Sequence, residues 1–308
     1  MIKDEIIIKD NVMSAVSGTL IVGYAYVRTY MEQATKHGGP YYVGHLNCMG
    51  DVSFKIWGGP VFDKVKENPI SDTICYLHGE VNEYAGVKSL IIKDVTPYTG
   101  DELTPDDFLE HKYDAEDLFA KLQTLLSHNV STEALTIFTT VITPIKERFC
   151  KEYAAVSHHD ACMSGLLAHT LKLVRLSQIL KFYPELSRVI DKDILFIGAA
   201  LHDIGKTVEY NNGSISEVGM KMSHLTLGLK LIEPYKTDII SLKGQPFYDD
   251  LESIIQQHHG EYGERPRTLV AYIIHILDGL EAQLTDIDDV IANATTNQVK
   301  IVDYKLSF

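Results

Sequence analysis

Short runs of alternating apolar and polar residues fill the first hundred positions of the chain. Alternation with a period of two is typical of strands that bury one face, and turns rich in Gly and Pro separate the runs. The predicted strands are 18–30, 40–50, 51–58, 72–81 and 88–95. Five short strands in this stretch predict a small closed barrel or a sandwich.

From Thr104 onward the spacing changes, because apolar residues now recur every three or four positions, as on one face of a helix. The predicted helices are 104–129, 131–156 (broken at Pro144), 165–180, 193–206, 222–232, 248–259 and 267–284. We therefore expect a multidomain α and β protein. Its predicted parts are a β-barrel over 1–100, a helical connector over 101–150 and an all-α helical bundle over 151–308.

The charge of the chain is unevenly distributed. The 308 residues carry a net charge of -14, which speaks against a protein that coats nucleic acid. Residues 1–98 contain nine basic and eleven acidic residues, a net charge of only -2. The first third of the chain is therefore the place where we expect a phosphate backbone to bind.

No apolar stretch reaches the eighteen residues of a membrane-spanning helix, and charges occupy the start of the chain where a signal peptide would be apolar. The four cysteines lie far apart without a CxxC pair, which argues against a zinc knuckle and a disulfide framework. We expect a cytoplasmic protein that does not bind membranes. A homo-oligomer is compatible with the sequence, although no feature requires one.

Histidines concentrate in the helical part, where eight of the thirteen fall between positions 158 and 275. His169 lies in the apolar stripe of its predicted helix, and Asp278 takes a position where a leucine would complete another stripe. His202 and Asp203 end a third apolar helix, with Gly205 as its predicted stop. Each residue alone reads as a hydrogen-bonded core side chain. Three helices that all turn His or Asp inward instead favour a shared divalent cation.

This set of residues resembles the signature of the HD superfamily of metal-dependent phosphohydrolases. The matching elements are the first histidine, the His202-Asp203 pair followed by Gly205 and Lys206, and the late Asp278. The resemblance covers roughly residues 155 to 285 and implies that His169, His202, Asp203 and Asp278 bind one metal ion inside a helical bundle.

The resemblance to two-metal members of the superfamily extends to His224 and His258, which would complete a second site with Asp203 as the bridge. The role of His259 is left open by the sequence: it is a ligand in place of His258, a substrate contact, or a partner that orients its neighbour. Two ions are favoured over one. Imidazole and carboxylate ligands suit manganese, iron, cobalt, nickel or zinc alike.

The implied chemistry is hydrolysis by metal-activated hydroxide, since a water shared by two cations loses its proton near neutral pH. Asp203 and Lys206 are the predicted catalytic residues. Lys206 would contact the phosphate. Its alternative role is to stabilise the C-terminal end of its helix by its positive charge.

The run SHHDACMSGLLAHT, 157–170, resembles the HHxxxxGGLLEHT run of one HD subfamily, with Ser164 and Ala168 as departures. His158 and His159 either reach substrate or are polar residues at a helix entry. The chain resembles this YhaM-like 3′-to-5′ exoribonuclease family along nearly its full length, which implies an OB-fold domain ahead of the HD domain.

Residues 52–57 support the comparison with an OB-fold, because they predict an inward face and an outward face of one strand. Trp57 and Lys55 share the outward face, and a ring beside a cation is suited to a single strand, which offers bases and phosphates. Tyr24 and Arg28 alternate in the same way on the first strand. The alternative is that these aromatic residues fill the barrel.

The favoured function is a metal-dependent phosphodiesterase, a 3′-to-5′ exonuclease on single-stranded RNA, or DNA, that releases nucleoside monophosphates. One alternative keeps the metal site and gives it a small substrate, a cyclic nucleotide or a dNTP. The other is a non-catalytic single-strand-binding protein, which would have no need of six metal-binding side chains.

Overall fold

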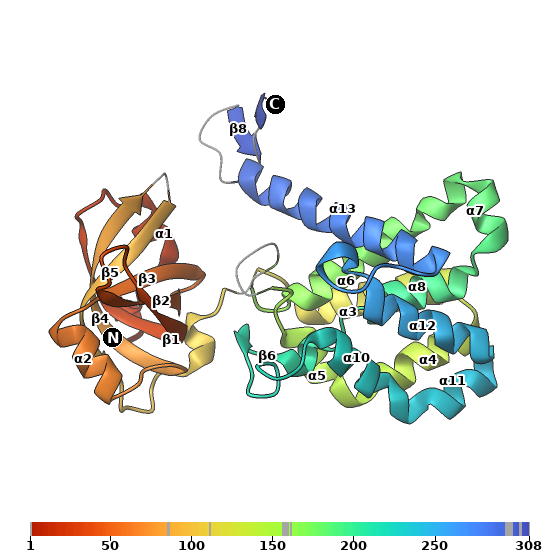
Figure 1. The fold of residues 1–308 in the computed structure, drawn as a ribbon, viewed down its shortest axis with the longest axis horizontal. Coiled ribbons are helices and arrows are strands. Elements are labelled where there is room, and N and C mark those ends of the chain that lie inside the picture. Colours follow the sequence, from red (N-terminus) through yellow and green to blue (C-terminus); the bar gives the residue numbers. More distant parts are fainter. Residues whose placement is uncertain are drawn as a thin grey trace. The chain divides into compact units, whose positions relative to one another are not determined.

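The chain folds into two compact units that meet between residues 111 and 112. The computed structural model describes residues 2–84, 87–110, 112–155, 160, 162–292, 298–301 and 304–307 (Figure 1). Each unit has its own hydrophobic core.

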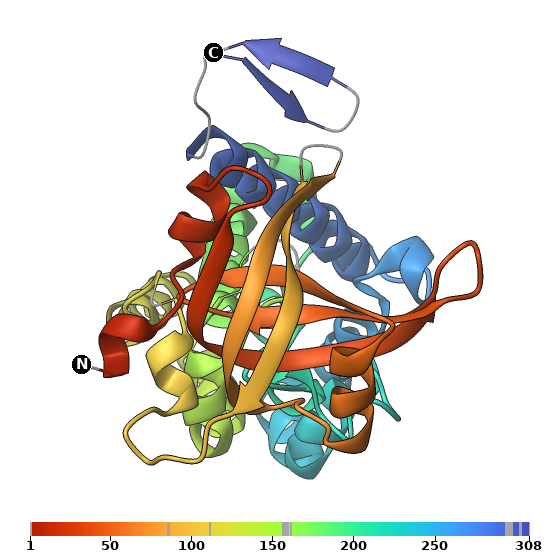
Figure 2. The same cartoon turned by 90° about the vertical axis from the view of Figure 1, so that its left-hand side faces the viewer.

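The first unit is a closed five-stranded barrel, with a neighbour order of β1-β2-β3-β5-β4 (Figure 2). Its strands are β1 (Leu20–Ala34), β2 (Pro40–Asn47), β3 (Asp51–Trp57), β4 (Thr73–Tyr84) and β5 (Val87–Pro97). All neighbours are antiparallel except β3 and β5. Helix α1 (Lys9–Ser14) precedes the barrel and α2 (Pro60–Glu67) joins β3 to β4. The predicted OB-like barrel is confirmed.

The barrel core follows the alternation of its strands. Val52, Phe54 and Ile56 of β3 are buried with at most 1% of their surface exposed. Strand β1 departs from regular alternation, because its pairing with β2 shifts register between Val27 and Thr29. A β-bulge of this kind turns the following side chains toward the opposite face of the sheet.

The second unit is a helical bundle, as predicted. Its helices are α3 (Ala115–Asn129), α4 (Thr132–Ile142), α5 (Lys146–Lys151), α6 (Gly165–Leu176), α7 (Pro184–Val189), α8 (Lys192–Leu201), α9 (Lys206–Glu209), α10 (His224–Ile232), α11 (Lys236–Lys243), α12 (Gln245–Gln257) and α13 (Leu269–Ala292). Two short hairpins accompany them: β6 (Tyr210–Asn211) with β7 (Ser214–Ile215), and β8 (Gln298–Ile301) with β9 (Tyr304–Ser307).

Helix α8 lies at the centre of this bundle and packs against α3, α4, α6, α12 and α13. Apolar residues surround it on every side, and Leu195, Ile197 and Leu201 are fully buried. An entirely apolar helix is stable only when its whole circumference is covered. The sequence DILFIGAAL therefore requires the central position.

The helices after residue 112 contribute to this same core through Leu122, Phe138 and Phe149. The sequence predicted a separate connector over 101–150, whereas the structure makes residues 115–151 part of the second unit. The predicted break at Pro144 corresponds to the 3-10 turn Thr143–Ile145 between α4 and α5. Among the helices within the described ranges, none is both long enough and apolar enough to cross a membrane.

Candidate metal centre

Five segments of the second unit bring histidines and aspartates to one place. They are His169 of α6, His202 and Asp203 directly after α8, His224 at the start of α10, His258 and His259 directly after α12, and Asp278 of α13. All seven residues were singled out from the sequence. Most are buried in a core that is otherwise apolar.

The turn after α8 passes unusually close to α10. A Cβ atom on Gly205 would lie 1.9 Å from the carbonyl oxygen of His224, so no other residue fits here without moving the backbone. Gly205 has right-handed helical dihedrals, with φ -63°, and does not act as the left-handed helix stop that the sequence suggested. Its role is close approach: the glycine lets the turn with Asp203 lie against the start of α10.

The first cluster consists of His169, His202 and Asp278. The Nε2 atom of His169 lies 3.1 Å from Oδ1 of Asp278 and 3.2 Å from Nε2 of His202. Both histidines are almost completely buried. Three donor atoms from three helices thus converge within the reach of one cation.

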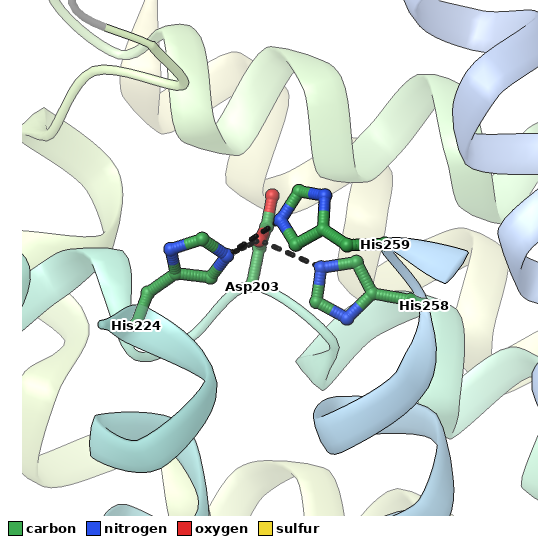
Figure 3. A group of neighbouring side chains, drawn as sticks. All are labelled: Asp203, His224, His258 and His259. Carbon is green, nitrogen blue, oxygen red and sulfur yellow. Dashed lines mark hydrogen bonds and ion pairs between the residues drawn. The ribbon is translucent and has the colours of Figure 1, made fainter. Parts of the chain in front are cut away.

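The second cluster consists of Asp203, His224, His258 and His259 (Figure 3). The Oδ1 atom of Asp203 lies 3.4 Å from Nε2 of His258 and 3.6 Å from Nε2 of His224. Nε2 of His259 is 2.7 Å from Nε2 of His224. His259, whose role the sequence left open, therefore points its ring into the same space as its neighbour.

Asp203 belongs to both clusters. Its Oδ1 faces the second cluster, and its Oδ2 lies 3.2 Å from Nε2 of His202 in the first. Burial alone would raise the pKa of this carboxyl, but Lys206 and His202 outweigh that effect and hold the pKa well below its usual range. Asp203 is consequently an ionised carboxylate with one oxygen for each cluster.

The histidine rings are fixed from behind by acceptors at Nδ1. The Nδ1 atom of His202 lies 2.9 Å from the carbonyl oxygen of Ala199, and that of His258 lies 3.1 Å from the carbonyl oxygen of Ile255. A ring that donates its Nδ1 proton carries its lone pair on Nε2. The lone pairs therefore point toward the two clusters.

These donor atoms fit a bound metal. Oδ1 of Asp203 and Nε2 of His258 are buried and have no hydrogen-bond partner in the described part of the chain. A buried polar atom without a partner costs about 1–3 kcal/mol, so such atoms call for a missing partner. Lone pairs of imidazole and carboxylate groups converge here, so the missing partner is not another hydrogen-bond acceptor. A divalent transition-metal ion accepts such lone pairs.

Lys206, the predicted phosphate contact, is buried one helical turn beyond the pair, with its Nζ 2.7 Å from Oδ2 of Asp203. Burial would lower the pKa of Lys206, but the Asp203 carboxylate outweighs burial and raises it, so the side chain is a cation. His158 and His159 lie outside the residues that the structure describes.

On the barrel, the structure brings two predicted nucleic-acid contacts together. Trp57 is 45% exposed, and Nζ of Lys55 lies 5.7 Å from the centre of its ring. Tyr41 of β2 is the cross-strand neighbour of Trp57, with ring centres 4.9 Å apart. Tyr41 was not recognisable in the sequence, because its place beside Trp57 depends on the pairing of β2 with β3.

The other two predicted contacts lie elsewhere. Tyr24 packs edge-on against Tyr76 and Tyr98, with ring centres 4.8 and 5.4 Å away. Arg28 is only 1% exposed, and its guanidinium lies 3.0 Å from the Asp51 carboxylate. The expectation of an exposed Arg28 is wrong, because this side of β1 is covered. Tyr26, two residues earlier on the same predicted face, is only 2% exposed and packs with Leu103 and Phe108.

Two carboxylates that the sequence analysis missed contact the metal-centre histidines. Glu281 lies 2.5 Å from Nδ1 of His169, and Glu209 lies 2.8 Å from Nδ1 of His224. Glu281 follows Asp278 by three residues, so helical spacing places both carboxylates on one face of α13. That spacing was the available signal for Glu281; nothing in the local sequence marked Glu209.

Comparison with known proteins agrees with this geometry. The HD domain family matches residues 166–283. The 3′-5′ exoribonuclease YhaM of Shouchella clausii (strain KSM-K16) is 26% identical over 286 residues, which cover 88% of this chain and 86% of that protein.

A solved structure, the asparaginyl-tRNA synthetase from Pyrococcus horikoshii, aligns with 47% of this chain and 36% of its own, at 13% identity and a TM-score of 0.26. A similarity this low carries no information on function. The HD match and the long alignment support a hydrolase that is similar to YhaM-like HD phosphohydrolases, with an OB-like barrel ahead of its HD domain.

Proposed function

We propose that this protein is a 3′-to-5′ exonuclease that removes nucleoside monophosphates from single-stranded RNA with the help of two divalent transition-metal ions. The observation that carries the proposal is the position of Asp203, whose two oxygens face two separate clusters of imidazoles. The substrate and the direction come from the name of the relative, an exoribonuclease that aligns with 88% of this chain.

In the proposed site, His169, His202 and Asp278 would hold one ion and His224 and His258 the other. Asp203 would contribute one oxygen to each cluster. His259 is a further candidate ligand of the second ion, since its Nε2 lies 2.7 Å from that of His224. Bound ions of this kind supply a hydroxide nucleophile near neutral pH and neutralise the phosphate oxygens.

Lys206 has two tasks in this proposal. Its ammonium holds Oδ2 of Asp203 at 2.7 Å, which keeps the shared carboxylate in one orientation. The same positive charge favours a phosphate that approaches the clusters, because charge interactions are strong in a buried site. Lys206 is therefore proposed as a catalytic residue together with Asp203.

The outward face of β2 and β3 is proposed to bind the RNA strand. Trp57 and Tyr41 offer aromatic surface on which bases stack, and Lys55 offers a cation for the backbone phosphates. Tyr24 is a further proposed contact, because it remains partly exposed within its tyrosine cluster. Arg28 is not included, since its charged group is buried against Asp51.

The test uses one RNA oligonucleotide labelled either at its 3′ end or at its 5′ end, and the same sequence as DNA. The purified protein is loaded with Mn²⁺ and compared with the Asp203→Ala variant. Cyclic nucleotides and dNTPs are assayed in parallel. We expect the 3′ label to appear at once as a mononucleotide, while the 5′ label passes through a ladder of shortening products.

Two results would overturn the proposal. Turnover of cyclic nucleotides or dNTPs without cleavage of either oligonucleotide would assign the site to small substrates. Tight oligonucleotide binding without turnover at any metal concentration would identify the protein as a non-catalytic single-strand-binding protein. Faster cleavage of DNA than of RNA would retain the nuclease and reassign its substrate.

A further inference from the structure

Two glutamates outside the proposed ligand set each hold one histidine of the metal centre. Oε2 of Glu281 lies 2.5 Å from Nδ1 of His169, in the first cluster. Oε2 of Glu209 lies 2.8 Å from Nδ1 of His224, in the second. The remaining Nδ1 contacts described above, those of His202 and His258, go to backbone carbonyl groups. Each cluster thus has one histidine held by a carboxylate.

The difference between the two kinds of acceptor matters for metal binding. Either acceptor fixes the ring and its tautomer, but only a carboxylate adds a negative charge behind the imidazole. That charge makes the ring a better electron-pair donor at Nε2, and loss of such a partner lowers metal affinity by about 10–100-fold.

We propose that Glu281 and Glu209 are positioning residues, one for each cluster, and that each sets the metal affinity of its own cluster. The inference rests on the proposed function, because it requires that both clusters bind metal. It adds that the two ions depend on separate glutamates, although they share Asp203.

The surroundings of Glu281 show that its charge is maintained in the core. Oε1 of Glu281 accepts a hydrogen bond of 2.7 Å from the Thr285 hydroxyl, and the Lys172 ammonium lies 3.4 Å from the same oxygen. Glu281 is therefore an ionised acceptor.

Lys172 also explains why this region is not a third metal site. Asp160, His169 and Glu281 lie close enough to form a group of three ligands. The ammonium of Lys172, however, is 2.8 Å from Oδ2 of Asp160 as well as near Glu281, so a cation already compensates both carboxylates. Tyr113 donates a further hydrogen bond to Asp160, at 2.6 Å.

Glu209 contacts both the backbone and the side chain of His224, the first residue of α10. Its Oε2 is paired with Nδ1 of His224, and its Oε1 accepts a hydrogen bond of 2.9 Å from the backbone N–H of the same residue. The N–H groups of a first helical turn lack partners within the helix. Glu209 thus fixes both the start of α10 and the ring that this start presents to the second cluster.

The test is a titration of metal-free full-length protein with Co²⁺, followed by calorimetry and by the visible absorption of the bound ion. The variants are Glu281→Gln and Glu209→Gln, which keep the side-chain shape and remove the charge. His169→Ala and His224→Ala identify which binding event belongs to which cluster.

We expect two binding events per chain in the wild-type protein. Glu281→Gln should weaken the event that His169→Ala abolishes by about 10–100-fold, and shift its absorption band, while the other event stays within about twofold. Glu209→Gln should do the converse. Each variant therefore serves as the matched control for the other.

A combination of variants separates positioning from general damage to the fold. In the His169→Ala background, Glu281→Gln should no longer change Co²⁺ affinity, whereas Glu209→Gln should still weaken the remaining event. If Glu281→Gln does not fold, Thr285→Val keeps the Glu281 carboxylate, removes the hydrogen bond to its Oε1 and the one that Thr285 accepts from Lys172, and should shift the same event by less.

Equal weakening of both events by both glutamate variants, or unchanged affinities in both, would overturn the inference. A wild-type protein that binds no Co²⁺ would instead overturn the proposed metal centre, and the inference with it. The two failures are distinguishable, because only the second appears without any substitution.

Discussion

The ammonium of Lys206 lies 2.7 Å from the carboxylate of Asp203, and both side chains are buried at the junction of the two histidine clusters. Asp203, which is proposed to contact two metal ions, therefore also has a cation of the protein, Lys206, beside it. Removal of either partner should therefore affect a different property of the site.

Asp203→Ala should abolish RNA turnover and reduce the amount of bound metal, because both clusters lose the carboxylate that they share. Metal per chain is measured by elemental analysis after dialysis, and oligonucleotide affinity by fluorescence anisotropy. The affinity should stay within about twofold if strands bind mainly on the barrel. A variant with full turnover would exclude this site from the chemistry.

Lys206→Met should lower kcat by about 10²–10³-fold, the usual loss when a preorganised electrostatic group is removed from an active site. The variant should retain metal, since Lys206 offers no lone pair while it is protonated. Lys206→Arg serves as the control that keeps the charge. Unchanged kcat in the Met variant would leave Lys206 only a structural pairing with Asp203.

Trp57→Ala should weaken the binding of a single-stranded oligonucleotide by about 1–3 kcal/mol, the range found for the loss of one stacked base. Tyr84→Ala is the matched control, because Tyr84 is an aromatic residue of the same barrel that is 79% exposed. Equal losses in both variants would show that no particular face of the barrel binds the strand.

Arg28→Ala should destabilise the barrel, by less than the about 3–5 kcal/mol typical of a fully buried pair, because Asp51 is 22% exposed and keeps His45 at 2.7 Å. The measurement is chemical denaturation of the full-length protein, followed by the fluorescence of Trp57, the single tryptophan. A loss of RNA affinity with unchanged stability would contradict the burial of Arg28 and restore it as a direct contact.

Asp193 should make the stability of the helical unit depend on pH. Its carboxylate accepts a 3.0 Å hydrogen bond from the N–H of Ser131 and lies 2.8 Å from the Lys243 ammonium. Burial would raise the pKa of Asp193, but Lys243 and Ser131 outweigh burial and lower it. A lowered folded-state pKa means stabilisation that is present above the unfolded pKa, about 3.9, and lost as the pH falls.

Asp193→Asn should accordingly unfold at a lower urea concentration than wild type at pH 7, and the difference should shrink below about pH 4. Lys192→Gln, a charge change at the exposed first residue of α8, is the control. A difference that is constant from pH 7 to pH 3 would indicate that charge at Asp193 does not contribute.

Four of the seven residues, His169, His202, Asp203 and Asp278, were recognisable in the sequence because each breaks a local rule. The other three, His224, His258 and His259, were singled out only by the resemblance to two-metal HD proteins. His169 interrupts an apolar stripe and His202-Asp203 end an apolar helix, and a buried polar group requires a partner. Lys55 and Trp57 followed from strand alternation, which needs no knowledge of neighbouring strands. Local periodicity was sufficient in these cases.

Other features depend on contacts between distant segments. Glu209 and Tyr41 became visible only through their partners, His224 and Trp57. Arg28 was misplaced because this side of β1 is covered by residues far along the chain, such as Leu103 and Phe108, and periodicity within one strand does not show such a cover.

The sequence by itself determined the two kinds of architecture, the set of inward histidines and aspartates, and the family that this set resembles, since periodicity and spacing are local properties of the chain. The resemblance also implied the place of Asp203 between two sites. Only the tertiary structure decided that His259 joins the second cluster and that Glu281 and Glu209 hold one histidine each. The physical reason is that the direction of a side chain's lone pair is fixed by its packing partners, and these come from segments far apart in the chain.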